Sequence, residues 1–302
     1  MKIYLIGVGG VGGFYGGLMA EKNLDITLVC RGNSFGAIKK DGLVLNSPDG
    51  IHRIFQVRLI EHISEITDPD LIILAVKSYD LENVASELED VVNSNTMVIT
   101  IQNGLDNDKV VVGHLECLVF PGLVLVAAAK TAPNEITQRG SQRKLVFGSR
   151  DGKITSRMLE IESVLKSAGI DAHVSESIDQ ELWNKFLFVL SFASATVAQM
   201  GPIGEALGNS QNLKIYKDVL REAILVGKSE GVEFEPNIFE ATLKGALDFD
   251  PLAVSSMLVD IQNHRRTEVD ALHGVLIRLS KKHGLSVPAT EAVYHRILNL
   301  QG

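Results

Sequence analysis

The chain opens with two short apolar runs that are separated by a glycine-rich segment and a helical pattern. Residues 2–6 (KIYLI) and 25–30 (DITLVC) predict strands, and residues 11–22 can form a helix between them. The order strand, loop, helix, strand is that of a βαβ unit, in which the two strands lie parallel in one sheet.

The same alternation continues further along the first half. Apolar runs at 71–76 and 97–101 flank a helical stretch at 81–92, and strands that alternate with helices predict a doubly wound parallel sheet covered on both faces. Residues 118–147 are strand-like without an obvious crossover helix, and 133–134 (Pro-Asn) mark a turn within them. These residues predict strands of mixed direction at the edge of the sheet.

The hydrophobic pattern becomes helical in the second half, after a predicted helix at 154–167 and a short strand at 171–174. Ser177 followed by Gln180 is a capping pattern that starts a strongly apolar helix. The predicted helices of this half cover residues 178–199, 211–230, 236–246, 251–283 and 289–300.

Length and composition favour two domains. A chain of 302 residues with 45% hydrophobic content can bury a substantial core. We predict a Rossmann-type α/β domain at residues 1–175 and an all-α domain at residues 176–302. Because no linker rich in Pro, Gly or Ser separates them, we expect the domains to be tightly joined, with a cleft between them.

The overall charge restricts the partners of the chain. A formal net charge of -8 argues against general affinity for nucleic acid or an anionic membrane, since both need a basic surface. Cys30 and Cys117 are the two cysteines, which favours a reducing cytoplasm over a disulfide framework. The eight histidines show no metal-ligand spacing, so we expect no metal.

The glycine-rich segment follows the pattern GxGxxG. It is formed by Gly7, Val8, Gly9, Gly10, Val11 and Gly12. In such a loop the first glycine allows a tight turn, the second lets a pyrophosphate approach the backbone, and the third lets the helix pack on the strand. An ordinary glycine-rich turn is the alternative, but the flanking strand, helix and second strand favour dinucleotide binding.

The residue after the second strand indicates which dinucleotide binds. NAD sites usually carry Asp or Glu there to bind the ribose 2′-hydroxyl, whereas this chain has Arg31. A guanidinium can pair with a 2′-phosphate through its planar fork. NADP(H) is therefore the preferred cofactor, and a solvated surface arginine is the alternative.

Lys185 lies among Leu182, Trp183, Phe186 and Leu187 in the apolar helix that begins near residue 178. A lysine with such neighbours either extends its amine to water or loses hydration, and loss of hydration lowers its pKa and prepares it for proton transfer. A structural core lysine is the alternative.

Three further side chains are candidates. Lys77 and Asn103 follow the apolar runs at 71–76 and 97–101, and doubly wound sheets bind ligands at the carboxyl ends of their strands. The spacing of Glu268 alone indicates a solvated charge on the surface of a helix.

The sequence resembles the ketopantoate reductase family, the 2-dehydropantoate 2-reductases of pantothenate synthesis. The matching segments cover nearly the whole chain: GVGGVG at 7–12, Arg31, AVKS at 75–78, QNG at 102–104, ELWNK at 181–185 and SSMLVDIQNHRRTEVD at 255–270. The resemblance implies a Rossmann domain, a helical domain like the C-terminal domain of 6-phosphogluconate dehydrogenases, and an active site in the cleft. It implies Lys185 as the general acid, Glu268 as a ligand of the substrate hydroxyl and Ser256 as a substrate contact. It places Lys77 and Asn103 near the nicotinamide and the substrate.

The chain departs from this family at two positions. The family commonly has asparagines four and eight residues after the catalytic lysine, where this chain has Val189 and Ala193. Each lost hydrogen bond to a polar substrate removes about 0.5–1.5 kcal/mol of binding. Thr196, about 20° from Lys185 around an ideal helix, is a candidate to supply a hydroxyl instead. On a single predicted helix at 251–283, Ser256 and Glu268 would lie about 120° apart.

These observations predict an NADPH-dependent reductase that converts ketopantoate to pantoate, with Lys185 as proton donor. One alternative keeps the reaction and changes the substrate to a more apolar 2-keto acid or ketone. A second alternative is a non-catalytic NADPH-binding regulator. Helical domains of this kind can dimerise, so a homodimer is a further expectation.

Overall fold

The computed structural model describes residues 1–301 and divides into two compact units. The first unit comprises Met1–Gln102 and Asp106–Ile178. The second comprises Asn103–Leu105 and the residues from Asp179 onward. The first unit is α/β and the second is helical, so the predicted fold class is confirmed.

A ten-stranded sheet forms the centre of the first unit, with strand order β4-β3-β9-β8-β7-β6-β1-β2-β5 and β10 paired with β9. The strands are β1 (Ile3–Ile6), β2 (Ile26–Val29), β3 (Leu43–Ser47), β4 (Gly50–Ile54), β5 (Arg58–Ile60), β6 (Leu71–Leu74), β7 (Met97–Thr100), β8 (Leu118–Ala132), β9 (Glu135–Gly148) and β10 (Asp171–Ser175). From β5 to β8 every pairing is parallel, as the alternating pattern predicts.

The long hairpin β8–β9 turns the parallel sheet into a mixed one. β8 pairs in parallel with β7 and antiparallel with β9, which in turn pairs with β3 and β10. The prediction that residues 118–147 lie at the edge of the sheet is wrong. The hairpin β3–β4 extends the sheet beyond the first residues of β9, and β10 pairs with its last residues.

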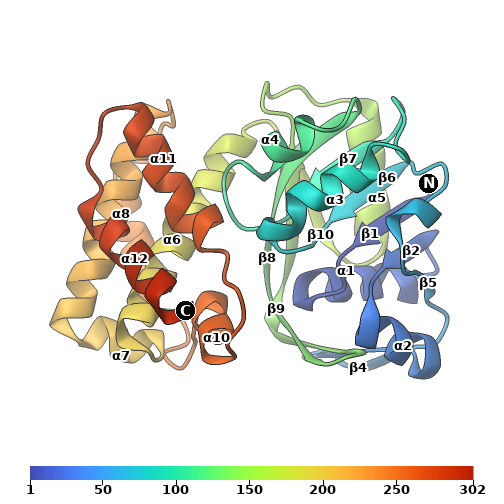
Figure 1. Cartoon of the computed structure of the whole chain (residues 1–302), viewed down its shortest axis with the longest axis horizontal. Helices are drawn as coiled ribbons and strands as arrows, with labels where there is room; N and C mark the ends of the chain where they lie inside the picture. The colour runs from blue at the N-terminus through green and yellow to red at the C-terminus, as the bar shows by residue number, and fades with distance from the viewer. Residues whose placement is uncertain (302) are drawn as a thin grey trace. The chain divides into compact units, whose positions relative to one another are not determined.

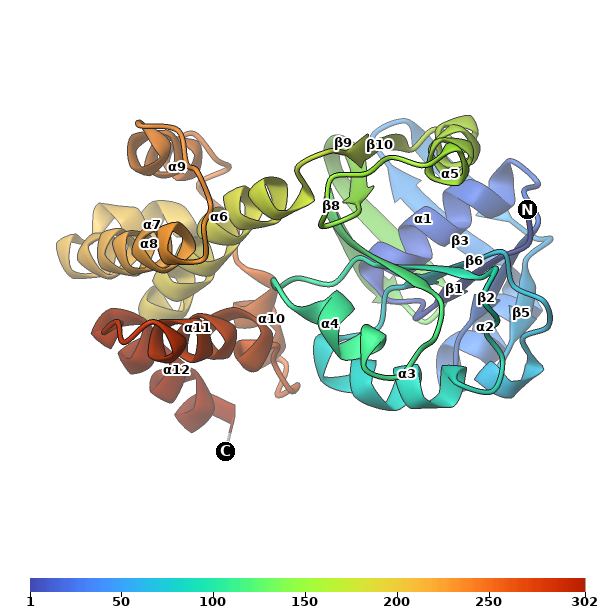
Figure 2. The ribbon, with the colours of Figure 1, turned by 90° about the horizontal axis from the view of Figure 1, so that it is seen from above.

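Helices cover both faces of this sheet (Figure 2). The helices of the first unit are α1 (Gly10–Glu21), α2 (Gly32–Asp41), α3 (Leu81–Leu88), α4 (Asn107–Val112) and α5 (Ser156–Ser167), with short 3-10 turns η1 (Ile63–Glu65) and η2 (Ser78–Asp80). α1 and α5 lie on one face of the sheet, and α3 and α4 on the other.

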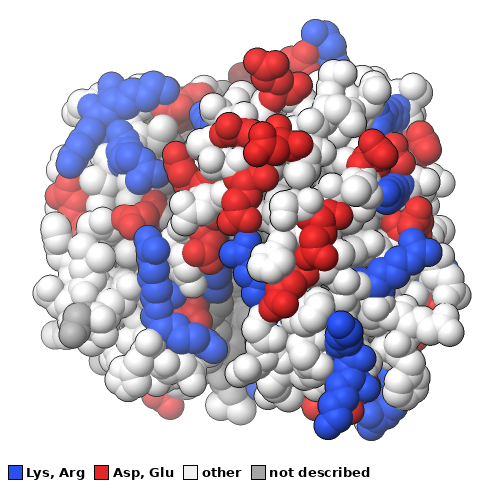
Figure 3. Space-filling model, turned by 45° about the vertical axis from the view of Figure 1, so that its right-hand side comes forward, with Lys and Arg blue, Asp and Glu red and all other residues white. Residues whose placement is uncertain are grey.

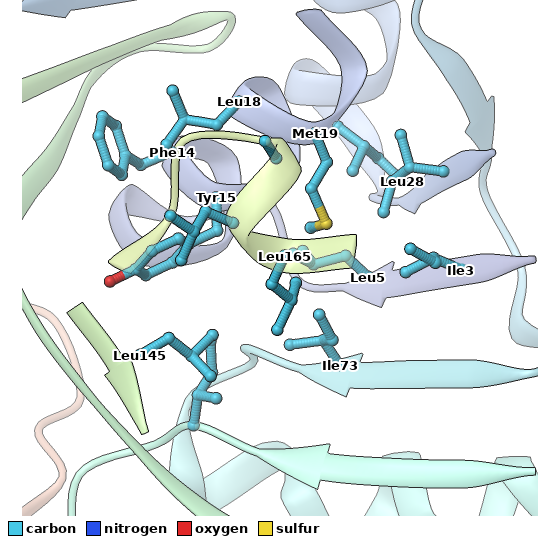
Figure 4. Packing of buried hydrophobic residues seen from close by; sticks show 14 of the residues in the cluster. Ile3, Leu5, Phe14, Tyr15, Leu18, Met19, Leu28, Ile73, Leu145 and Leu165 are labelled. Carbon is cyan, nitrogen blue, oxygen red and sulfur yellow. The ribbon is translucent and has the colours of Figure 1, made fainter. Parts of the chain in front are cut away.

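Alternate side chains of each central strand enter the two core layers that result. Ile3 and Leu5 of β1 contribute to the layer under α1 and α5, which Figure 4 shows in detail. Tyr4 and Ile6 contribute to the opposite layer under α3 and α4. This period of two is the geometry of a β-strand buried on both faces.

The second unit is built from helices (Figure 1). They are α6 (Ile178–Gln199), α7 (Ile203–Gly208), α8 (Ser210–Ser229), α9 (Ile238–Leu247), α10 (Ser256–Gln262), a π-helical turn η3 (Asp270–Gly274), α11 (Val275–Lys282) and α12 (Pro288–Gln301). Four of the five predicted helices correspond to α6, α8, α9 and α12. The fifth, at 251–283, is wrong as a single helix, because α10 and η3 are separate.

A capped break replaces the predicted helix at 251–283. Ser255 begins α10 by accepting a hydrogen bond from the N–H of Leu258 at 3.1 Å. His264 ends it with a φ of 52°, and the N–H groups of His264 and Arg265 bond to the carbonyls of Ile261 and Asp260. This is the Schellman arrangement, which usually places glycine at the left-handed position. Histidine is among the residues enriched there.

The surface shown in Figure 3 carries interspersed acidic and basic side chains. Within residues 1–301, no helix combines the length and apolar character that crossing a bilayer requires. No group of three or more His, Cys, Asp and Glu side chains in that range is arranged to hold a metal ion. Cys30 and Cys117 are both free thiols.

Candidate functional site

The glycine loop after β1 has no room for side chains at three positions. Gly7 has a φ of +102°, and a Cβ there would lie 2.7 Å from the backbone nitrogen of Val76. A Cβ on Gly10 would lie 2.3 Å from the carbonyl oxygen of Ala128, and one on Gly12 only 2.0 Å from that of Gly7. The tight turn and the close helix–strand approach of a dinucleotide loop are both present.

Gly9 differs from the other glycines of the loop, because a Cβ there would meet nothing within 4 Å. Gly9 is the N-cap of α1, and neither a side-chain cap nor an acidic residue occupies the first turn of this helix. The N–H groups and the dipole of a helix N-terminus attract anions. Open space at the second glycine, next to this N-terminus, fits a pyrophosphate, so the residues present suit a dinucleotide.

Arg31 lies two residues after the end of β2 and is the N-cap of α2. Its guanidinium pairs with Glu87 of α3 at 2.8 Å, and both side chains are about half exposed. Glu61 accepts a hydrogen bond from the N–H of Gly32 at 3.2 Å. The region around Arg31 therefore holds carboxylates as well as a cation. The sequence pattern could not reveal either carboxylate, because Glu61 follows β5 and Glu87 lies on α3, both far from Arg31 along the chain.

A second cation lies near the start of α2. The ammonium of Lys130 on β8 donates to the hydroxyl of Ser34 at 3.0 Å, and Ser34 is itself buried. Sequence spacing could not reveal this contact, because 96 residues separate the two side chains.

Lys77 and Asn103 follow two strands that are neighbours in the sheet. Lys77 comes after β6 and is the N-cap of η2, while Asn103 comes after β7 and precedes Gly104, which has a φ of +123°. Both side chains are partly exposed. They thus follow the carboxyl ends of parallel strands, the edge at which doubly wound sheets bind ligands.

Lys185 lies in α6 of the second unit and is partly buried. Its neighbours Trp183 and Phe186 are buried and meet edge to face, with ring centroids 5.5 Å apart. Burial lowers the pKa of the Lys185 amine to about 8, and the negative charge of Glu268 raises it in part. An amine of this pKa is readily available for proton transfer near neutral pH.

Glu268 is not a solvated charge within a helix. It is partly buried in the segment before η3, and its carbonyl accepts hydrogen bonds from the N–H groups of Ala271 and Leu272 at 3.2 Å. The break between α10 and η3 also removes the premise that Ser256 and Glu268 occupy one helix. The angle of about 120° between them does not apply.

Ser256 is exposed at the first position of α10. Thr196 is not a free hydroxyl as expected, because it is fully buried and its hydroxyl forms a hydrogen bond with the Ser255 hydroxyl at 2.7 Å. The Ser255 oxygen in turn caps α10. Thr196 therefore fixes the start of the helix that presents Ser256.

Val189 and Ala193 have different surroundings. Val189 is partly exposed, whereas Ala193 is only 1% exposed.

An aromatic cluster lies next to these two positions in the sequence. Phe188 and Phe192 stack with ring centroids 5.4 Å apart, and the centroid of Phe249 lies 5.6 and 5.5 Å from theirs. Since residues three, four and seven positions apart share a helix face, this aromatic cluster begins on the face that carries Lys185. The sequence could not reveal this cluster, because Phe249 lies far from α6 along the chain.

Family models match both units of the chain. The model described as ketopantoate reductase PanE/ApbA matches residues 3–152, and that of the ketopantoate reductase PanE/ApbA C terminal matches residues 177–301. The chain belongs to the ketopantoate reductase family. The resemblance read from the motifs is thereby confirmed, and the chain is a member of a family of oxidoreductases.

Other proteins of known sequence or structure match this member of the ketopantoate reductase family over nearly its whole length. An uncharacterized oxidoreductase YkpB of Bacillus subtilis is 30% identical to this chain, and the match covers 97% of each protein. A 2-dehydropantoate 2-reductase of Halobacterium salinarum is 27% identical, and the match covers 95% of each protein. A ketopantoate reductase from Ralstonia eutropha has a TM-score of 0.93 at 24% identity, covering 100% of this chain and 98% of the other. A D-mandelate dehydrogenase with NADH and anilino(oxo)acetate has a TM-score of 0.90 at 21% identity, with the same coverage. These structures share the fold.

Proposed function

We propose that this protein reduces 2-dehydropantoate to pantoate with NADPH. The observation that carries the proposal is the amine of Lys185, whose pKa of about 8 is set by burial and by the nearby charge of Glu268. The glycine loop of the first unit, with open space at Gly9, supports a dinucleotide cofactor. The family and its curated 2-dehydropantoate 2-reductases support the substrate.

Three side chains of the second unit have separate roles in the proposed reaction. When bound, the reduced nicotinamide supplies the hydride. Lys185 in its ammonium form stabilises the negative charge that develops on the carbonyl oxygen and donates the proton. Glu268 accepts a hydrogen bond from a substrate hydroxyl and raises the pKa of Lys185, which keeps more of the amine protonated. Ser256, exposed at the start of α10, contacts the substrate.

Cofactor selectivity rests on Arg31 in this proposal. Its guanidinium binds the 2′-phosphate in exchange for the Glu87 carboxylate, a half-exposed partner whose loss costs little. Lys77 and Asn103, at the ends of neighbouring strands, contact the nicotinamide end.

The test is NADPH consumption by the purified protein with ketopantoate and a panel of related 2-keto acids. We expect turnover, and we expect Lys185→Ala to lose at least ~10²-fold in kcat while NADPH affinity is retained. Lys214→Ala is the matched control, because Lys214 is an exposed lysine of the same unit. Cofactor binding without reduction of any keto acid would refute the proposal, and unchanged turnover of Lys185→Ala would remove Lys185 from it.

A second candidate substrate is a more apolar 2-keto acid. Val189 offers an apolar and partly exposed side chain one turn from Lys185, and the aromatic cluster of Phe188, Phe192 and Phe249 lies beside it. The structurally similar D-mandelate dehydrogenase was solved with an aromatic oxoacetate. Higher kcat/KM with phenyl-substituted 2-keto acids than with ketopantoate would favour this candidate, and the reverse order would exclude it.

We also propose a homodimer, because a structurally similar ketopantoate reductase from Staphylococcus aureus is described as dimeric. Sedimentation velocity of the purified protein tests it, and a single monomer peak at micromolar concentration would contradict it.

A further inference from the structure

A histidine that the proposed reaction does not use lies fully buried in the second unit. His273 has 0% exposure and belongs to the π-helical turn η3. Its Nε2 lies 2.9 Å from the hydroxyl oxygen of Ser194 on α6. π-helical turns are rare and are frequent at functional sites.

The hydrogen-bond pattern assigns the tautomer of this imidazole. The Ser194 hydroxyl donates its proton to the carbonyl oxygen of Leu190 at 2.8 Å, so its oxygen accepts from the Nε2–H of His273. The Nδ1 atom is then the unprotonated nitrogen, and within residues 1–301 it is buried without a hydrogen-bond partner. A buried acceptor left unpaired is unfavourable. A leucine of similar size would avoid this cost, so the His273–Ser194 bond serves more than core packing.

The bond joins the two segments that carry the proposed catalytic groups. Ser194 lies on α6, the helix of Lys185, and His273 lies in the turn that begins two residues after Glu268. Two other side chains around Glu268 are held by α12: Thr267 bonds to Gln301 at 2.6 Å, and Asp270 accepts from Tyr294 at 2.7 Å. Among these three hydrogen bonds, the one from His273 is the bond that reaches α6.

We propose that His273 is a positioning residue which, through Ser194, holds the Glu268 segment in register with the helix that carries Lys185. The inference rests on the proposed function for its catalytic meaning. The contact itself, and the coupling of Glu268 to Lys185, are properties of the second unit. They can be measured in the full-length protein whatever its substrate is.

The chain offers a matched pair of variants. Ser194 and Ser191 lie three residues apart on α6 and are both fully buried, but the Ser191 hydroxyl has no partner among the described residues. Ser194→Ala removes the acceptor of His273, whereas Ser191→Ala removes a hydroxyl of the same size from the same helix. His273→Gln keeps an N–H donor at this position, and His273→Leu removes it.

The readout is the pKa of Lys185, followed by NMR of isotope-labelled lysine in the full-length protein and assigned with Lys185→Ala. Glu268 is the charged group that raises this pKa. Ser194→Ala and His273→Leu should therefore lower it by at least ~0.5 unit as the carboxylate moves away. Ser191→Ala and His273→Gln should match the wild type. With an active substrate, the alkaline limb of the kcat profile should shift to lower pH by the same amount.

Two results would overturn the inference. One is an unchanged Lys185 pKa in Ser194→Ala, and the other is an equal change in Ser191→Ala. If His273→Leu does not fold, the serine pair still decides the question. Failure of the proposed function would appear separately, as full turnover in Lys185→Ala or as no turnover in the wild type.

Discussion

Acid should destabilise the second unit through His273. Burial lowers the pKa of this imidazole from 6.5 to about 3. Between these values the unfolded chain binds a proton that the folded chain does not, so stability falls as the pH drops below 6.5 and does not change through this group above it. From pH 7 to pH 4 the expected loss is about 3 kcal/mol, from the 2.5 units between 6.5 and 4.

Urea unfolding followed by tryptophan fluorescence isolates this effect. The chain has a single tryptophan, Trp183, which is buried on α6, so its emission reports the second unit. The unfolding free energy of the wild type and of His273→Gln is measured at pH 7 and pH 4. Glutamine keeps a donor for Ser194 but does not titrate, so the variant should lose about 3 kcal/mol less than the wild type over this range. Other titrating groups are common to both proteins and cancel.

His295→Gln is the control, because His295 is an exposed histidine of the same unit. Its loss of stability from pH 7 to pH 4 should equal that of the wild type. Equal losses in the wild type and in His273→Gln would refute the reasoning, since they would mean that the folded protein accepts the proton on His273 as readily as the unfolded chain does.

Three further outcomes are expected. Glu268→Gln should move the alkaline limb of the kcat profile to lower pH, because the Glu268 charge raises the pKa of Lys185; an unmoved limb would contradict this. Arg31→Ala should weaken NADPH binding by at least ~10-fold and NADH binding far less, as fluorescence titration would measure; equal losses would count against the 2′-phosphate role. Gly12→Ala should abolish cofactor binding, because its Cβ would lie 2.0 Å from the carbonyl oxygen of Gly7; calorimetry showing normal affinity would contradict it.

The sequence predicted most of the first unit because its central strands are buried on both faces and read as continuous apolar runs. The hairpin β3–β4 was missed because neither of its strands forms a long apolar run. β3 has three buried apolar residues before Asn46 and Ser47, and β4 is mostly exposed. The place of residues 118–147 in the sheet could not be predicted without this hairpin, because β3 pairs with β9. The sequence indicates that strands are present but not which strands pair with one another.

The second unit shows a similar limit. Helical periodicity continues through 251–283, but the break at His264 has neither glycine nor proline to mark it. For the site, Lys185 could be singled out because a charge within an apolar helix is conspicuous. Glu268 could not, because its partial burial and its effect on Lys185 arise from a break that the pattern conceals. Thr196 was given a substrate role from helix geometry alone, which cannot reveal that Ser255 takes its hydroxyl.

The crowding around the glycine loop has a genetic consequence. At Gly12 and Gly10 the atoms that exclude a side chain belong to the backbone, the carbonyls of Gly7 and Ala128. At Gly16, one turn further along α1, the obstacle is instead the side chain of Leu28, 2.5 Å from the Cβ position. A harmful alanine at Gly16 should therefore be rescued by a second mutation that shortens Leu28. No substitution elsewhere can shorten a main-chain carbonyl, so lesions at Gly10 and Gly12 should yield only true revertants in a suppressor screen.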